Sequence, residues 1–158
     1  MPIENLTPDI RNAVRAAIIG NDQVLLLEKA EGDRGACYAL PGGAQKPGQT
    51  LAQALNQECL EEIDSAVEIA ALMNVADHCK TSDTDPSSTR HLVEFLFRCT
   101  VPDNYVAQNG IKPDKSQTDV VRVNLSGLAA IQLYPESLSH WLPESILRDT
   151  ATYLGIME

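Results

Sequence analysis

The chain has 158 residues, of which 44% are hydrophobic, and its mean hydropathy is −0.15. These values are typical of one globular domain with a core of ordinary size. The formal net charge of −10 at pH 7 and the pI near 4.6 argue against long-range attraction to nucleic acid or to an anionic membrane. An anionic ligand would therefore have to be bound locally, by metal ions and a few placed cations.

Several location signals are missing from the sequence. No apolar run approaches the ~20 residues of a membrane-spanning helix, and residues 1–10 lack the basic-then-apolar pattern of a signal peptide. The cysteines have no paired metal-ligand spacing; they are Cys37, Cys59, Cys79 and Cys99. We therefore expect free buried thiols in a reducing, cytoplasmic environment.

Apolar alternation predicts strands, and clusters of Gly, Pro, Asn and Asp predict turns. The first half is expected to contain strands at 12–19, 23–27 and 37–40, a turn at 20–22 and a loop at 28–36. The second half is expected to contain strands at 66–78, 90–100 and 119–124, with loops at 80–88 and 103–118. Residues 125–133 should form a short helix or turn, and the C-terminal end a helix that stops at Gly155. This order of elements indicates an α/β fold, a mixed sheet between helical layers.

The central feature of the sequence is the segment 40–65, LPGGAQKPGQTLAQALNQECLEEIDS. It opens with Pro41-Gly42-Gly43, which we interpret as a turn. A helix follows, with Thr50 as its N-cap and Gln53 completing a capping box. Its apolar stripe has the spacing of a core-facing side and comprises Leu51, Ala52, Leu55, Cys59 and Ile63.

Three acids, Glu58, Glu61 and Glu62, stand at i, i+3 and i+4 of this helix, beside the apolar stripe. Like charges at these spacings destabilise a helix by roughly 0.2–0.5 kcal/mol per pair, and the C-terminal end of a helix prefers cations. A hard divalent cation with oxygen ligands would offset that cost. The alternative is a solvated acidic patch, which the Pro-Gly-Gly segment and the position beside the stripe make the weaker interpretation.

These residues resemble the Nudix box, in which Gly, five residues, Glu, seven residues and Arg-Glu precede an apolar residue, any residue, Glu-Glu, any residue and Gly. Gly43 takes the first position, and Glu58-Cys59-Leu60-Glu61-Glu62 matches the core of the box. The sequence departs from the box at Gln49, which stands for Glu, at Gln57, which stands for Arg, and at Asp64, which stands for Gly. In the family that Glu and Arg brace the loop against the helix.

The resemblance implies a Nudix α/β/α sandwich and hydrolysis of a nucleoside diphosphate linked to another group, with Mg²⁺ or Mn²⁺ as cofactor. Glu58 and Glu62 would be the principal metal ligands, Glu61 a ligand or the general base, and the Gly43 carbonyl a further ligand. The identity of the base stays open. The choice among ADP-ribose, a nucleotide sugar, a dinucleoside polyphosphate and a nucleoside triphosphate also stays open.

Candidate substrate contacts lie outside the box. Arg15 and Lys29 are basic residues that could face a phosphate, and the family commonly has an arginine on the first strand, so Arg15 is expected to bind substrate. Glu94 is an acid within a strand, either at a solvent-facing edge or as an auxiliary acid over the metal site. His91 is expected to be structural. Two aromatic rings, Tyr134 and Trp141, could stack on a base but are expected in the core.

The expected partner is a small-molecule nucleotide, with no nucleic acid and no membrane, and the expectation allows for a homodimer. A second hypothesis is a Nudix-fold nucleotide-binding or regulatory module with little or no turnover. The departures at Gln49, Gln57 and Asp64 favour that module. The retained Glu58 and its two acidic neighbours favour the enzyme, because a metal-free module has no need for three clustered acids.

Overall fold

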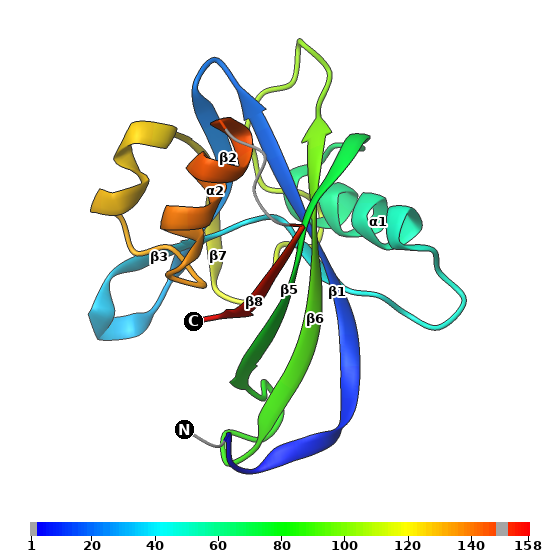
Figure 1. Ribbon diagram of the computed structural model, residues 1–158. Helices are drawn as coiled ribbons and strands as arrows, with labels where there is room; N and C mark the ends of the chain where they lie inside the picture. The colour runs from blue at the N-terminus through cyan, green and yellow to red at the C-terminus, as the bar shows by residue number, and fades with distance from the viewer. Residues whose placement is uncertain (1–2, 148–151) are drawn as a thin grey trace.

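The computed structural model describes residues 3–147 and 152–158 of the chain (Figure 1). The described part contains eight strands, two α-helices and two short 3-10 helices. Up to the first long helix the elements are β1 (Leu6–Gly20), β2 (Gln23–Ala30), η1 (Gly32–Arg34), β3 (Ala36–Ala39), β4 (Gly42–Ala44) and α1 (Leu51–Ile63). The remaining elements are β5 (Glu68–Thr81), β6 (Thr89–Thr100), β7 (Gln117–Asn124), η2 (Leu125–Ala130), α2 (Leu138–Leu147) and β8 (Tyr153–Met157).

The strands form one mixed sheet with the order β3-β2-β1-β6-β5-β8, in which β4 also pairs with β1 and β7 with β2. The pairs β1–β6 and β5–β8 are parallel, and the other pairs are antiparallel. Helix α1 lies on one side of the sheet, and α2 with η2 lies on the other (Figure 1). The predicted α/β sandwich is therefore confirmed.

Each side of the sheet has its own apolar core, because successive strand residues point to opposite faces. Ala16 and Ile18 of β1 pack on the α1 side, together with Leu55 of the helix. Ala17 packs on the other side, in the cluster that contains Leu142 of α2. Both faces of this strand are buried, which explains its continuous apolar run.

Three expectations about the elements are corrected. Strand β1 begins at Leu6 rather than at residue 12, because the outer part of β1 pairs with β6. Gly42 and Gly43 do not form a turn but belong to the short strand β4, which pairs with Val14 and Arg15 of β1. The described chain end is not helical, because Gly155 lies within β8, beside β5, and α2 is described as far as Leu147. The part of the predicted helix at 148–151 lies outside the described residues.

Two compositional expectations agree with the structure. All four cysteines are free, and three of them, Cys37, Cys59 and Cys99, are buried. Burial raises the pKa of the Cys59 thiol, so this side chain behaves as a small apolar core residue. No helix in the described part of the chain has both the length and the apolar character needed to cross a membrane.

Candidate active site

The predicted capping box fixes the start of helix α1. Thr50 Oγ1 accepts a hydrogen bond from the Gln53 backbone N–H at 3.1 Å, and Gln53 Oε1 accepts one from the Thr50 N–H at 2.8 Å. At the other end, Asp64 has the left-handed conformation, with φ 57° and ψ 36°, that glycine adopts more easily. Gln108 Nε2 donates to Asp64 Oδ2 at 2.9 Å, so a side chain from the following loop supports this helix stop.

Glu62 is the most buried acid of α1, with 3% of its surface exposed. Its Oε2 accepts a hydrogen bond from the Gly42 backbone N–H at 2.9 Å. Burial outweighs this hydrogen bond and raises the pKa of Glu62 to about 8. The ionised carboxylate is therefore costly here unless a cation approaches it.

Glu58 lies directly against the glycine pair of β4. A Cβ atom on Gly43 would lie 2.6 Å from Glu58 Cδ, and a Cβ atom on Gly42 would lie 1.9 Å from the Val14 carbonyl oxygen. Gly42 also has φ 147°, a region that side chains disfavour. Gly42 is thus required for β4 to fit against the backbone of β1, whereas a side chain at Gly43 would displace the Glu58 carboxylate. Partial burial, and then the charge of Glu61, raise the pKa of Glu58.

Glu58 and Glu62, together called the acidic pair below, open into one cavity of about 260 Å³. Glu61 has other partners: its Oε1 accepts from Gln57 Nε2 at 2.9 Å, and its Oε2 lies 3.6 Å from Lys112 Nζ. The hydrogen bond from Gln57 lowers the pKa of Glu61. Among the described residues, no three His, Cys, Asp or Glu side chains converge closely enough to ligate one ion. The structure therefore brings together two of the three predicted acids.

The donor set at this cavity suits a hard divalent cation. It consists of oxygens, from the two carboxylates of the acidic pair and from the backbone of Gly43, and Mg²⁺ and Mn²⁺ prefer oxygen ligands. Burial makes the charged form of both carboxylates costly and raises their pKa values. A cation between them would offset that cost. The residues present therefore fit the group that the sequence implies.

The neutral amides that replace the family's ion pair form the expected contact. Gln49 Nε2 donates to Gln57 Oε1 at 2.6 Å, and Gln49 Oε1 accepts from the Lys46 backbone N–H at 3.0 Å. Since Gln57 also donates to Glu61, a chain of hydrogen bonds runs from the loop to the acids. The loop is thus braced without charge, and neutral hydrogen bonds are about half as strong as charge-assisted ones.

Restoring both charges, Gln49→Glu with Gln57→Arg, should raise turnover or leave it unchanged. Either single change should do worse than the pair, because Gln49→Glu adds an unpaired negative charge near the acids and Gln57→Arg adds a cation that would bind Glu61 instead of the loop. A double-mutant cycle on kcat and Tm measures the coupling. Additive effects would contradict the hydrogen-bonded pair, and Asn56→Asp, on the same helix, is the control for an added charge.

Arg15, which is partly exposed, and the buried Glu94 form an ion pair beside the cavity. Arg15 Nε and Nη2 lie 3.3 and 3.2 Å from Glu94 Oε1, and His78 Nδ1 lies 3.4 Å from the same oxygen. Burial alone would raise the pKa of Glu94, but Arg15 and His78 hold it at about 2. With 1% exposure, Glu94 is not at a solvent-facing edge, so that alternative is wrong. Arg15 also lines the cavity of the acidic pair.

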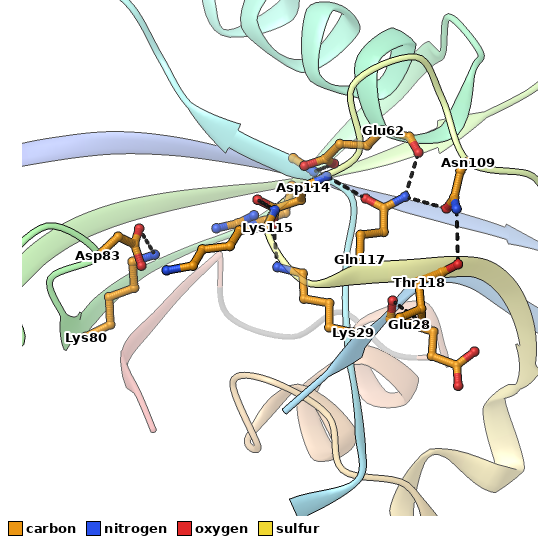
Figure 2. Close-up of polar contacts among 12 residues, drawn as sticks. Glu28, Lys29, Glu62, Lys80, Asp83, Asn109, Asp114, Lys115, Gln117 and Thr118 are labelled. Atoms are coloured by element: carbon orange, nitrogen blue, oxygen red, sulfur yellow. Dashed lines mark hydrogen bonds and ion pairs between the residues drawn. The ribbon is translucent and has the colours of Figure 1, made fainter. Parts of the chain in front are cut away.

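The loop between β6 and β7 folds over the C-terminal end of α1 (Figure 2). Gly110 N–H and Gln117 Nε2 both donate to the Glu62 carbonyl, at 2.9 and 2.8 Å. Lys112 N–H donates to the Glu61 carbonyl at 2.9 Å, and Tyr105 Oη to the Ile63 carbonyl at 2.7 Å. These donors satisfy carbonyls that a helix end leaves without intrahelical partners.

The same loop carries Asp114, a cavity residue that sequence reasoning missed. Its backbone N–H donates to Gln117 Oε1 at 2.9 Å, and its carboxylate forms an ion pair with Lys29 (Figure 2). Burial opposes ionisation of Asp114, but Lys29 holds its pKa below the usual range. Asp114 lines the cavity of the acidic pair as well as a neighbouring cavity of about 540 Å³. The composition of the loop predicted substrate contacts in general but singled out no residue.

The remaining candidates are distributed around this site. Tyr134 is 45% exposed and lines the larger neighbouring cavity, so the expected core position is wrong for this ring. Its ring centroid is 5.4 Å from that of His78. His91 Nε2 lies 2.7 Å from Asp77 Oδ1, a contact within the sheet.

Comparison with known proteins agrees with the fold. The family model described as NUDIX domain matches residues 9–142. A nucleoside triphosphatase NudI from Enterobacter sp. (strain 638) is 41% identical over 99 residues, which are 58% of this chain and 70% of that protein. A NUDIX hydrolase structure from Nitrosomonas europaea has a TM-score of 0.67 at 23% identity, covering 93% of this chain and 78% of the other. An ADP-ribose pyrophosphatase structure from Streptococcus suis 89-1591 has a TM-score of 0.61 at 17% identity, with 94% and 98% covered.

The match over residues 9–142 spans the sheet from β1 to β7, the acidic helix α1 and the glycine pair beside it. The chain belongs to the Nudix family.

Proposed function

We propose that the chain is a metal-dependent hydrolase that cleaves a diphosphate bond in a nucleoside diphosphate linked to another group. The observation that carries this proposal is the single cavity in which the acidic pair meets Gly43 and Arg15. ADP-ribose, nucleotide sugars and nucleoside triphosphates all contain such a bond. The names of the similar proteins, a nucleoside triphosphatase and an ADP-ribose pyrophosphatase, support the same class of substrate.

Four residues that line the cavity have a role in this proposal. Glu58, Glu62 and the Gly43 carbonyl hold Mg²⁺ or Mn²⁺, which when bound neutralises the diphosphate and lowers the pKa of an attacking water. Arg15 adds positive charge for the phosphates, and Glu94 fixes the orientation of its guanidinium group.

Glu61 is the proposed general base. Glu58 and Glu62 are assigned to the metal, and the hydrogen bond from Gln57 lowers the pKa of Glu61, so its carboxylate is unprotonated at neutral pH and free to accept a proton. To accept this proton, Glu61 Oε2 releases the Lys112 ammonium group, which is 3.6 Å away, and binds the attacking water instead.

The second candidate is a nucleotide-binding module with little turnover. The substitutions Gln49, Gln57 and Asp64 favour it, since each weakens a contact that the family builds with a charge or a glycine. However, the two glutamines remain hydrogen-bonded at 2.6 Å, and Asp64 closes the helix in the left-handed conformation. The hydrolase therefore remains the better-supported proposal.

A substrate screen separates the two candidates. The protein is incubated with nucleoside triphosphates, ADP-ribose, nucleotide sugars and dinucleoside polyphosphates, each with Mg²⁺ or Mn²⁺, and released nucleoside monophosphate, pyrophosphate and phosphate are measured. Metal-dependent release from at least one compound supports the hydrolase. Thermal stabilisation by a nucleotide without any product would favour the binding module instead.

Metal binding provides a separate prediction. Calorimetric titration with Mn²⁺ should detect a site that the double change Glu58→Gln with Glu62→Gln abolishes, because both carboxylates are lost. The matched control is Glu4→Gln with Glu68→Gln, which removes two charges at exposed positions. Equal Mn²⁺ affinity in the double variant and the control would place the metal elsewhere.

A further inference from the structure

Three cations stand on adjacent strands, on the sheet face that borders the acidic pair. Lys80 of β5 is directly opposite Arg90 of β6. Arg11 of β1 is opposite Leu92, the next residue on the same face of β6. Arg11, Arg90 and Lys80, called the cation row below, all line the same cavity as the acidic pair.

The cation row has few counterions of its own. No side-chain hydrogen bond or ion pair joins Arg11 or Arg90 to another described residue, and Arg90 Nε is buried without a partner. Lys80 Nζ lies 3.4 Å from Asp83, whose side chain is 75% exposed. Exposed pairs of that kind contribute little stability, so the row has no strong ion pair of its own, although Asp114 and the acidic pair line the same cavity.

Without a bound anion, the arrangement of the cation row destabilises the folded protein. Like charges directly opposite each other on neighbouring strands destabilise a sheet, and Arg90 loses solvation without gaining a hydrogen bond. The chain has only 12 Lys and Arg residues against 22 Asp and Glu, so acids to pair with them are plentiful. A bound anion would relieve both costs, and guanidinium groups match phosphate oxygens in a two-pronged geometry.

We propose that the cation row binds the terminal phosphates of a polyphosphate substrate whose cleaved bond lies at the acidic pair. This inference rests on the proposed hydrolase function and narrows it to nucleotides with a triphosphate or a longer phosphate chain. The cation row places positive charge at the position where ADP-ribose or a nucleotide sugar would have a neutral sugar, so these compounds would gain nothing from it.

The strand register supports this path for the phosphates. Gly43 is paired with Val14 of β1, and Arg11 lies three residues before Val14 on the same strand. At about 3.3 Å per residue, the backbone of the row is roughly 10 Å from the glycine pair. The long side chains of Arg11 and Arg90 shorten this distance. A chain of phosphates running along β1 can therefore contact both the glycine pair and the cation row.

Binding of inorganic tripolyphosphate, titrated in EDTA, tests the row without any metal or turnover. Arg90→Gln and Arg11→Gln should each raise the Kd for tripolyphosphate about tenfold or more, as expected for a lost charge-assisted hydrogen bond. The control is Arg98→Gln, which removes the same charge at an exposed position of β6, about 26 Å along the strand from Arg90. This control should bind tripolyphosphate like the unaltered protein.

Stability and kinetics provide two readouts that a merely structural role would not give. Because like-charge repulsion is relieved, the Tm of anion-free Arg90→Gln should be unchanged or higher. With Mn²⁺, the KM for a nucleoside triphosphate should rise about tenfold while kcat changes less, and the KM for ADP-ribose should stay near that of Arg98→Gln.

The outcomes distinguish this inference from the hydrolase proposal. Tripolyphosphate binding that Arg90→Gln weakens, in a protein that hydrolyses no nucleotide, supports the anion site and contradicts the hydrolase. Normal hydrolysis in which Arg90→Gln and Arg98→Gln behave alike overturns the anion site alone. Failure of the unaltered protein to bind tripolyphosphate in EDTA also overturns it.

Discussion

Replacing Glu62 with Gln is expected to lower turnover by about 10²–10⁴-fold while leaving the fold intact. The amide is nearly isosteric and can still accept the hydrogen bond from the Gly42 N–H. It cannot supply the negative charge that a metal ligand at this position needs. Turnover is measured on the best nucleotide of the screen, with saturating Mn²⁺. Glu68→Gln, at an exposed position of β5, is the control, and equal turnover in the two variants would contradict the assignment of Glu62.

The same substitution should stabilise the metal-free protein, with a definite pH dependence. The pKa of Glu62 is about 8 in the folded chain, against an ordinary value of 4.5. Between pH 4.5 and 8 the folded state holds a proton that the unfolded state releases. The stabilisation from the protonated Glu62 carboxyl is therefore complete below about pH 4.5 and is lost as the pH rises through 8. In EDTA, Tm should therefore decrease less with pH in Glu62→Gln than in the unaltered protein. Parallel Tm curves for the two proteins would show that burial of this carboxyl has no such effect.

Replacing Glu94 with Gln should destabilise the fold by about 1–3 kcal/mol, because the partly buried Arg15 would lose its charged partner. Urea unfolding measures this loss, and Glu68→Gln is again the exposed control. Removing both charges, with Arg15→Met and Glu94→Gln together, should cost less than Glu94→Gln alone, because no unpaired cation remains. A double variant that is less stable than either single variant would contradict the ion pair as the cause.

Acidic pH should weaken the ion pair between Arg15 and Glu94. The pKa of Glu94 is held at about 2, below its ordinary value of 4.5. Its contribution to stability is therefore complete above about 4.5 and is lost as the pH falls through 2. The stability of Glu94→Gln should change less than that of the unaltered protein over this acidic range.

The elements that sequence reasoning predicted well depend on local signals. The capping box of Thr50 and Gln53 lies within four residues of chain, and the structure contains both of its hydrogen bonds. The apolar stripe of α1 also follows from spacing alone, and Leu55, Cys59 and Ile63 are buried. Glu62 was placed beside that stripe, and its burial follows from the same helical geometry.

The elements that were missed depend on partners far away in the chain. Strand β8 pairs with β5, where Tyr153 is opposite Val75, and no pattern within five apolar residues separates such a strand from the end of a helix. Gly42 joins a strand because β1 offers it a partner, whereas Pro-Gly-Gly by itself favours a turn. Asp114 gave no signal, since its position depends on Lys29 and Gln117 rather than on periodicity.

The loop that covers the end of α1 has a consequence for how the chain can diverge. Gly110 is so close to the helix that a Cβ atom there would lie 2.3 Å from the Glu61 carbonyl oxygen. Further along, Gln117 reaches the Glu62 carbonyl, so both ends of the segment 110–117 are tied to the same helical turn. An inserted residue would break one of these ties and disturb the acids directly. New substrate preferences in descendants of this chain should therefore arise by exchange of side chains within the segment, and its length should stay constant.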